Sequence, residues 1–205
     1  MRVVLATSNP GKIAELAAML APLGIEVLPQ SRYTATQAVE TGLTFVENAI
    51  LKARHAASHS GLAAIADDSG IEVDALDGAP GIHSARYAGE RASDQQNLAK
   101  LLRELEGVES ARRTARYRCA LVYLRSDRDS APIVCQESWE GRIGLKPRGS
   151  GGFGYDPIFE LPQLGLTAAE LPAAIKNELS HRGKAFRALF AQLAQIVARP
   201  SGSSD

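Results

Sequence analysis

A short apolar run that ends in two carboxylates constrains the fold more than any other stretch of this sequence. Residues 63–66 read Ala-Ala-Ile-Ala, and Asp67, Asp68, Ser69 and Gly70 follow directly. Four to eight apolar residues bounded by a turn signal are typical of a strand buried on both faces, so this stretch predicts a strand that delivers acid to a cleft. Because successive side chains of a strand point to opposite faces, only one aspartate can face the pocket and take part in the chemistry. The other is expected to have a supporting, structural role. Taken alone, the Asp-Asp-Ser-Gly stretch favours a different interpretation, a strand-to-turn junction where Asp bonds local backbone N–H groups.

The size and the charge of the chain limit the classes of function. With 205 residues and 45% hydrophobic content, it can bury one sizeable core, which predicts one domain, or one domain with two lobes, over residues 1–199 and a disordered tail over residues 200–205. Lys plus Arg equals Asp plus Glu at 23 each, so no overall field attracts nucleic acid or anionic lipid. No apolar run approaches the roughly 18 residues of a membrane helix, so we expect a soluble, cytoplasmic protein. Cys119 and Cys135 lie in apolar segments and are expected to be buried, reduced thiols.

The N-terminus predicts a strand, a polar loop and a helix in succession. The strand covers residues 2–6, the helix extends through Leu20, and the loop between them is Thr7, Ser8, Asn9, Pro10, Gly11 and Lys12. Backbone N–H groups and hydroxyls at a helix N-terminus, with a lysine beside them, favour phosphate. The loop is not a Walker loop, because the earlier glycine and the hydroxyl after the lysine are missing. An ordinary capped turn is about as good an interpretation of this loop alone.

A second strand is expected over residues 25–28, and a polar stretch then carries Glu40 to a helix that ends near Ser60. Thr44 and Glu47 have the spacing of a capping box at the start of that helix. Helical periodicity puts Lys52 on or beside its inward face. A lysine there is a ligand if the face overlooks a cleft, and otherwise a side chain that snorkels at the margin of the core.

The second half of the chain predicts further strands and a glycine-rich loop. Ser93 caps a structural helix, and the runs at residues 114–124 and 133–143 predict an antiparallel hairpin. Residues 149–157 read Gly-Ser-Gly-Gly-Phe-Gly-Tyr-Asp-Pro, where four glycines permit close backbone approach and Phe153, Tyr155 and Asp156 could form a base pocket. A glycine-rich hairpin connection with Phe153 plugging the core is the equal alternative. Thr167 and Glu170 form a capping box leading toward Lys176, and residues 180–183 precede a final helix with a buried stripe of Phe186, Leu189, Phe190, Leu193 and Ile196.

Six motifs, in order and spacing, resemble the inosine/xanthosine triphosphate pyrophosphatase family over nearly the whole chain. They are Thr-Ser-Asn-Pro-Gly-Lys at 7–12, Glu-Thr-Gly-Leu-Thr-Phe-Val-Glu-Asn-Ala at 40–49, Asp-Asp-Ser-Gly at 67–70, Gly-Ala-Pro-Gly-Ile-His-Ser-Ala-Arg-Tyr at 78–87, Gly-Gly-Phe-Gly-Tyr-Asp-Pro at 151–157 and Ser-His-Arg-Gly at 180–183. The departures are small: Ser8 stands where many members have glycine, and Ile175 where an acidic residue is common. The bacterial members look most similar.

The resemblance implies an α/β fold, with an elongated mixed β-sheet, flanking helices and two lobes around a central nucleotide-binding cleft, usually in a homodimer. It implies hydrolysis of ITP, dITP and XTP to the monophosphate and pyrophosphate, which cleanses the nucleotide pool of deaminated purines. Asp68 would be the catalytic base and, with Glu40, would hold Mg²⁺. The implied phosphate ligands are Thr7, Ser8, Asn9, Pro10, Gly11, Lys12, Lys52 and Ser69. The implied base pocket consists of Phe153, which stacks on the base, with Gly154, Tyr155, Asp156, Lys176, His181 and Arg182.

Two other functions compete with this interpretation. One is a pyrophosphatase for other modified nucleotides, which would share the phosphate chemistry and differ in the base pocket. The other is a module that binds a modified nucleotide without turnover. Glu40 and Asp68 separate enzyme from binder, because extra negative charge does not help to bind a triphosphate unless it recruits a metal.

Overall fold

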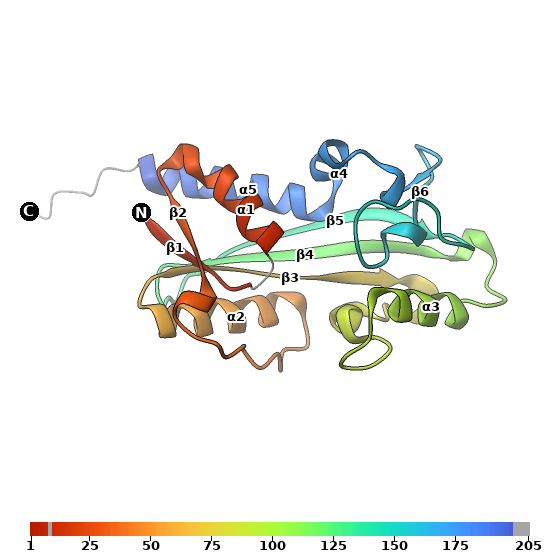
Figure 1. Ribbon diagram of the computed structural model, residues 1–205, viewed down its shortest axis with the longest axis horizontal. Helices are drawn as coiled ribbons and strands as arrows, with labels where there is room; N and C mark the ends of the chain where they lie inside the picture. Colours follow the sequence, from red (N-terminus) through yellow and green to blue (C-terminus); the bar gives the residue numbers. More distant parts are fainter. Residues whose placement is uncertain (8–9, 199–205) are drawn as a thin grey trace, which may run out of the picture. The chain divides into compact units, whose positions relative to one another are not determined.

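The computed structural model describes residues 1–7 and 10–198, which form a mixed α/β fold on a seven-stranded sheet (Figure 1). The strands lie in the order β2-β1-β3-β4-β5-β6-β7. Their bounds are β1 (Arg2–Leu5), β2 (Glu26–Pro29), β3 (Ala63–Val73), β4 (Thr114–Leu124), β5 (Ile133–Ile143), β6 (Phe159–Leu161) and β7 (Leu166–Thr167). The α-helices are α1 (Pro10–Leu20), α2 (Phe45–Ser60), α3 (Asp94–Glu104), α4 (Ala173–Leu179) and α5 (His181–Ala198).

The chain divides into two compact units. The first contains Met1–Asp68, Ala120–Gln136 and Ala185–Asp205, and the second contains Ser69–Cys119 and Glu137–Lys184. Strands β3, β4 and β5 and helix α5 pass from one unit into the other. The boundary on β3 falls between Asp68 and Ser69, so two neighbouring residues of one predicted site belong to different units.

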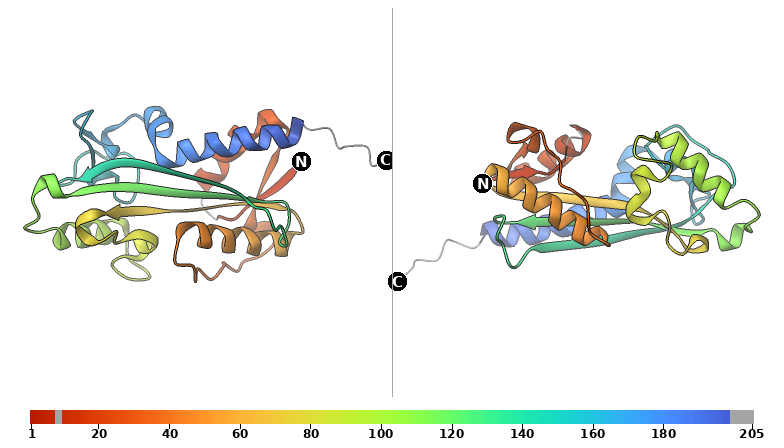
Figure 2. Two further views of the ribbon diagram at one scale, coloured as in Figure 1. Left: turned by 180° about the vertical axis from the view of Figure 1, so that it is seen from behind. Right: turned by 90° about the horizontal axis from the view of Figure 1, so that it is seen from below.

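The first unit is organised around parallel strands. β1 pairs in parallel with β2 and with β3, and Leu5, the last residue of β1, pairs with Ile65. Helix α2 covers one side of these strands, and α1 and α5 cover the other (Figures 1 and 2). Val3, Val4, Ala64 and Ile65 are fully buried, as expected for parallel strands covered on both faces. Asp67 and Asp68 therefore lie just beyond the carboxyl end of the β1–β3 pairing, the edge where open α/β sheets bind ligands.

Helix α2 begins and ends on local signals. The Thr44 side chain accepts a hydrogen bond from the backbone N–H of Glu47, and the Glu47 carboxylate accepts from the backbone N–H of Thr44, so the predicted capping box is confirmed. Gly61 ends the helix in a left-handed conformation with φ of 66°. The buried face contains Phe45, Asn48, Ala49, Ala53 and Ala56. Lys52 lies beside this face and is half-buried, as the periodicity predicts.

The second unit contains the antiparallel end of the sheet. β6 pairs antiparallel with β5 and with β7. Its core is rich in aromatic residues and includes Tyr117, Trp139, Tyr155 and Phe159. Helix α3 lies on the opposite side of the strands from α4 (Figures 1 and 2), and both hydrogen bonds of its Ser93–Gln96 capping box are present.

Several predicted boundaries are wrong. The strand that carries Asp67 and Asp68 does not turn at Ser69 but continues to Val73, because Ile71 and Val73 find a second core to enter. Helix α1 begins at Pro10, which is favoured in a first turn. The second strand begins and ends one residue later than expected.

The C-terminal part also differs from its prediction. The Thr167 capping box starts only a three-residue 3-10 helix (Ala168–Glu170), and Lys176 lies on the separate helix α4. Helix α5 begins at His181, so His181 and Arg182 form its first turn and do not precede it. Ile196 is exposed near the end of this helix and does not belong to its buried stripe.

Other predictions are confirmed or lie outside the described residues. The strands expected over residues 114–124 and 133–143 are β4 and β5, which are neighbours in the sheet. Cys119 and Cys135 are buried and form no disulfide. No helix of the described chain is long and apolar enough to cross a membrane. The tail over residues 200–205 lies outside the described residues, and the arrangement of two lobes around a cleft stays a prediction.

Candidate active site

An acidic cluster of Glu40, Lys52, Asp67 and Asp68 lies in the first unit. Lys52 Nζ donates to Asp68 Oδ1 at 2.6 Å and lies 3.2 Å from Glu40 Oε1. Lys52 comes from α2, Asp68 from β3, and Glu40 from the loop before α2, so three segments bring these side chains together. Asp67 is buried and acts on Lys52 as a nearby charge. Asp68 is thus the aspartate of the pair that meets Lys52 and Glu40.

Burial and charge oppose each other in the acidic cluster. Burial raises the pKa of Asp68 and outweighs the charge and hydrogen bond of Lys52, which lower it. Burial lowers the pKa of Lys52, but the carboxylates of Asp68, Asp67 and Glu40 together raise it above its usual value. Lys52 therefore stays protonated, while Asp68 holds its proton to higher pH than an ordinary aspartate. With three carboxylates around one ammonium, the cluster carries an excess of negative charge once Asp68 is ionised.

The donor set of the acidic cluster fits a hard divalent cation. Carboxylate oxygens are the ligands that Mg²⁺ prefers, and Mg²⁺ is commonly held by one or two carboxylates while water and phosphate oxygens complete its shell. Glu40 and Asp68 are placed to be those two carboxylates, since both already contact the same cation, the Lys52 ammonium. Among residues 1–7 and 10–198, no three His, Cys, Asp or Glu side chains form a ready-made metal cage.

The predicted phosphate loop is only partly described. Ser8 and Asn9 lie outside the described residues, as do the side chains of Pro10, Gly11 and Lys12. Thr7 directly follows the β1 edge, where the backbone N–H of Ala6 donates to the Ile65 carbonyl at 2.8 Å. The loop and the Asp67–Asp68 pair therefore start from neighbouring parallel strands at the same edge of the sheet.

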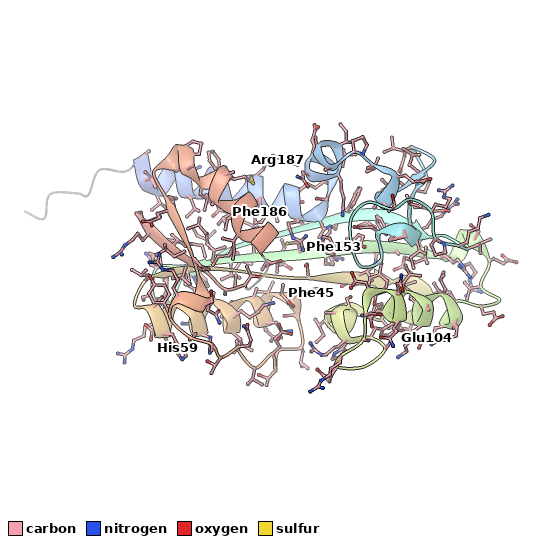
Figure 3. All side chains as sticks on the ribbon, in the orientation of Figure 1. Phe45, His59, Glu104, Phe153, Phe186 and Arg187 are labelled. Atoms are coloured by element: carbon pink, nitrogen blue, oxygen red, sulfur yellow. The ribbon has the colours of Figure 1, made fainter. Side chains whose placement is uncertain are left out.

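A second group of side chains, the Phe153 cluster, lies in the second unit and consists of Phe153, Asp156, Lys176 and Arg182. The Phe153 side chain is 57% exposed (labelled in Figure 3), which excludes the alternative in which it plugs the core. Lys176 Nζ lies 4.8 Å from the centre of its ring, and Arg182 Cζ lies 5.4 Å from it. Both cations lie over the ring of this exposed side chain, so an aromatic surface and hydrogen-bond donors occur together at one place.

Asp156 holds the Phe153 cluster together. It is 3% exposed, its Oδ2 atom accepts from the backbone N–H of Phe153 at 2.8 Å, and the same atom pairs with the Lys176 ammonium. Gly152 permits this approach, because its φ is +73° and a Cβ atom there would overlap the Asp156 carboxylate. Of the glycines in this motif, Gly152 is therefore required by the packing of the loop on Asp156.

The other predicted base-pocket residues have different positions. The Tyr155 side chain is buried, and its hydroxyl donates to the Ser84 carbonyl at 2.8 Å, so it anchors the loop from inside. His181 is buried and stacks on Tyr117 with ring centres 4.7 Å apart and an angle of 7° between the planes. The backbone N–H of Gly154 donates to Asp94 Oδ2 at 2.7 Å.

Sequence reasoning missed Tyr117 and Asp94, which contact the predicted base-pocket residues. Asp94 belongs to a helix that is interpreted from the sequence as structural. Tyr117 is one of several residues in the alternating polar and apolar pattern of its strand and does not stand out from them. Neither carries a local signal, because each depends on contacts with segments more than 35 residues away, such as the 39-residue separation of Tyr117 from Asp156. Only the fold brings these segments together.

Comparison with known proteins decides the family. The model of the Ham1 family matches residues 3–192. The chain belongs to the Ham1 family. Among curated relatives of this Ham1-family chain, the "dITP/XTP pyrophosphatase" of Vibrio parahaemolyticus is 58% identical over 97% of the chain and 99% of that protein. The "dITP/XTP pyrophosphatase" of Thioalkalivibrio sulfidiphilus is 60% identical over 94% of the chain and 98% of that protein. The resemblance drawn from the six motifs is therefore confirmed.

Solved structures of the family confirm the fold of this Ham1-family chain. A HAM1 protein from Coxiella burnetii superimposes with a TM-score of 0.92 at 46% identity, covering 95% of this chain and 99% of that one. The nucleoside-triphosphatase or dITP/XTP pyrophosphatase of Mycobacterium abscessus gives a TM-score of 0.79 at 40% identity, covering 92% and 98% of the two chains. The mixed α/β architecture predicted from the sequence is therefore correct.

Proposed function

We propose that this protein hydrolyses dITP, XTP and ITP to the corresponding monophosphate and pyrophosphate. The observation that carries the proposal is its identity of 58 to 60%, over nearly its whole length, with relatives named dITP/XTP pyrophosphatase. The two residue clusters fit this chemistry, since one has two carboxylates that could recruit a metal ion for the phosphates, with Lys52 beside them, and the other has an exposed ring on which a base can stack. By removing deaminated purine nucleotides, the activity would keep them out of DNA and RNA.

Asp68 would act as the general base for an attacking water. Water adds to a phosphorus of the anhydride that joins the α- and β-phosphates, the bridging P–O bond breaks, and the proton of the water passes to the Asp68 carboxylate. The raised pKa of Asp68 suits it for that proton, because a base is most useful when its pKa approaches the working pH. Lys52 would neutralise phosphate charge and keep Asp68 oriented through their 2.6 Å hydrogen bond.

Glu40 and Asp68 would hold Mg²⁺. The bound ion would supply neutralisation of the triphosphate charge. The experiment for this part is a titration of Mg²⁺ against activity after chelation with EDTA, in the wild type and in Glu40→Gln. We expect no turnover without the metal and a higher requirement for Mg²⁺ in Glu40→Gln. Glu47→Gln is a matched control seven residues away, because glutamine also completes a capping box.

The base would be recognised by the Phe153 cluster. Phe153 would stack on the purine, while Lys176 and Arg182 would donate hydrogen bonds to its oxo groups. Hypoxanthine and xanthine present an acceptor at the 6-position, where adenine presents an amino donor, so cationic donors favour the former. In this assignment Asp156 orders the donors that surround the ring.

A panel of nucleoside triphosphates with Mg²⁺, with pyrophosphate and orthophosphate measured separately, tests the proposal. We expect pyrophosphate from ITP, dITP and XTP and little turnover of ATP. Release of orthophosphate with accumulation of the diphosphate would contradict it. A preference for modified pyrimidine nucleotides would favour the pyrophosphatase of the other type, and binding without product would favour the non-catalytic module.

The setting of the activity forms part of the same proposal. The substrates are free nucleotides, so we propose that the protein acts in the cytoplasm, without nucleic acid or membrane as partner, and as a homodimer. Light scattering after size-exclusion chromatography tests the dimer, and a mass of one 21.8 kDa chain would exclude it under those conditions.

A further inference from the structure

The Tyr117 side chain contacts two residues of the predicted base pocket. It lies on β4, is 8% exposed and belongs to the core of the second unit. Its hydroxyl donates to Asp156 Oδ1 at 3.2 Å, and its ring stacks on His181. No motif of the sequence points to it, and it is not among the residues that the family resemblance implies.

The hydroxyl of Tyr117 completes the hydrogen bonding of Asp156. The Oδ2 atom of Asp156 is used by the Phe153 N–H group and by Lys176, and the Oδ1 atom receives the Tyr117 hydroxyl. A buried carboxylate with partners on both oxygens is held in one orientation, because rotation would leave charged oxygens unsatisfied at high cost. The orientation of Asp156 in turn sets where the Phe153 backbone and the Lys176 ammonium lie.

The ring of Tyr117 is itself held on several sides. Phe159 packs against it with ring centres 4.6 Å apart, Trp139 lies at 6.4 Å, and His181 covers it at 4.7 Å. Interlocked aromatic rings leave few alternative rotamers. The hydroxyl is therefore presented to Asp156 from a rigid base on the sheet, which is a more exact support than a loop can give.

The hydroxyl also remains a donor at every working pH. Burial, followed by the charge of Asp156 and its hydrogen bond, raises the pKa of Tyr117 well above the usual value of tyrosine. We therefore expect Tyr117 to act through geometry, by its hydrogen bond to Asp156 and its stacking on His181.

We propose that Tyr117 is a positioning residue for base recognition, which acts by fixing Asp156 through its hydroxyl and His181 through its ring. The inference rests on the proposed function, since it concerns how a 6-oxopurine is recognised at the Phe153 cluster. With Tyr117 in place, the Phe153 ring and the Lys176 ammonium keep a fixed spacing, and a base that stacks on the ring meets its donors without further ordering of the protein.

Tyr117→Phe tests the proposal, because it removes the hydroxyl and keeps the stacked ring. IMP, the product without pyrophosphate, is the probe of the base pocket, with AMP for comparison. We expect the Kd for IMP and the KM for ITP to rise by about tenfold, equivalent to about 1.4 kcal/mol, with kcat within about twofold of the wild type. The Kd for AMP should change less, so the preference for IMP falls.

Tyr123→Phe is the matched control. Tyr123 lies on the same strand and is also buried, but it belongs to the first unit, where its hydroxyl has a long contact of 3.9 Å with Met1 Sδ. Tyr123→Phe should leave the Kd for IMP unchanged. Equal losses in both variants, or equal loss for IMP and AMP in Tyr117→Phe, would show general loosening of the fold and overturn the proposal.

A double-mutant cycle with Asp156→Ala separates positioning from stability. If Tyr117 acts through Asp156, Tyr117→Phe should have little further effect on IMP binding in the Asp156→Ala background. An undiminished tenfold effect there would overturn the proposal. If the wild type binds IMP but releases no pyrophosphate from ITP, the proposed function fails while the IMP affinities still test Tyr117. If the wild type binds no IMP, there is no base pocket and both fail.

Discussion

Arg182 donates a hydrogen bond from Nη2 to the Oγ atom of Ser69, at 3.1 Å, within the second unit. Arg182 also lies over the Phe153 ring, and Ser69 directly follows Asp68 on β3. The cation expected to recognise the base is therefore in contact with the residue next to the expected catalytic carboxylate. Arg182 lies in the first turn of α5, where a cation opposes the helix dipole, so its position needs another favourable interaction. The contacts with Ser69 and Phe153 supply it.

Arg182→Ala should lower kcat/KM for ITP by at least about a hundredfold. The loss combines a hydrogen bond from a charged group, worth roughly 1.5 to 3 kcal/mol, with poorer positioning of the base. Hydrolysis of ATP, which we expect to be poor in the wild type, should change far less, because adenine offers no acceptor at the 6-position. Steady-state kinetics with both nucleotides measure this. Arg182→Lys keeps the charge without the planar fork and should recover part of the ITP activity. A drop by the same factor for ITP and ATP would make Arg182 a structural or phosphate residue and return base discrimination to Asp156 and Lys176.

Asp68→Asn should lower kcat by about 10² to 10⁴, the usual contribution of a positioned base. Loss of a metal ligand would enlarge the effect. Because burial raises the pKa of Asp68, its folded state binds a proton more tightly than its unfolded state, and its contribution to stability is lost as pH rises through the folded pKa. Asp68→Asn removes the unfavourable burial of an ionised carboxylate. Its thermal unfolding temperature at pH 7 should therefore be no lower than that of the wild type. Near-normal turnover would show that Asp68 is not the base, and the same substitution at Asp67 would be tested next.

Lys52→Met should move the acid limb of the pH–rate profile to higher pH. In the wild type, activity should fall as Asp68 becomes protonated, above the ordinary aspartate range, because its pKa is raised. Lys52 holds that pKa down through its charge and its hydrogen bond, so removing it raises the pKa of Asp68 further. The profile of kcat/KM for ITP reports the shift. Lys146→Met, which removes an exposed lysine, serves as the control. A limb that stays in place or moves to lower pH in Lys52→Met would mean that Asp68 is not the titrating group.

The parts of the fold that depend on local signals could be predicted from the sequence. The capping boxes at Thr44 and Ser93 and the strands at residues 114–124 and 133–143 match the structure, because caps and apolar runs are determined by neighbouring residues. The continuation of β3 beyond Ser69 could not be predicted, since a Ser-Gly pair is a turn signal in most contexts. Here two separate cores accept the two halves of one strand.

The candidate site shows the same division. Glu40, Lys52 and Asp68 were assigned through family motifs, and the structure places them in contact. The sequence left Phe153 equally divided between a core plug and a stacking surface, and only its exposure decides between them. Tyr155 illustrates the opposite case, because an aromatic residue two positions from Phe153 is buried. Periodicity gives no guidance within a glycine-rich loop, where no regular element fixes the direction of side chains.

Gly152→Ala should be more damaging than an alanine at an ordinary left-handed position, because the added Cβ also disturbs the Phe153 cluster. The alanine Cβ would overlap Asp156 Oδ2 and lie 2.9 Å from Lys176 Nζ, so the ion pair between these residues must shift. Gly165→Ala is the matched control, because Gly165 has a similar φ of +67° and open space around its Cβ position. The unfolding free energy of Gly165→Ala should fall by only about 1 to 2 kcal/mol, which is the cost of an alanine in the left-handed conformation.

Chemical denaturation and titration with IMP measure the two consequences separately. Gly152→Ala should lose more unfolding free energy than Gly165→Ala and should also bind IMP at least about tenfold more weakly, a difference of about 1.4 kcal/mol. Gly165→Ala should bind IMP as the wild type does. If both variants lost equal stability and kept their affinity for IMP, the close approach of Gly152 to Asp156 would have no part in base recognition, and Asp156 would be a core residue that only happens to lie beneath Phe153.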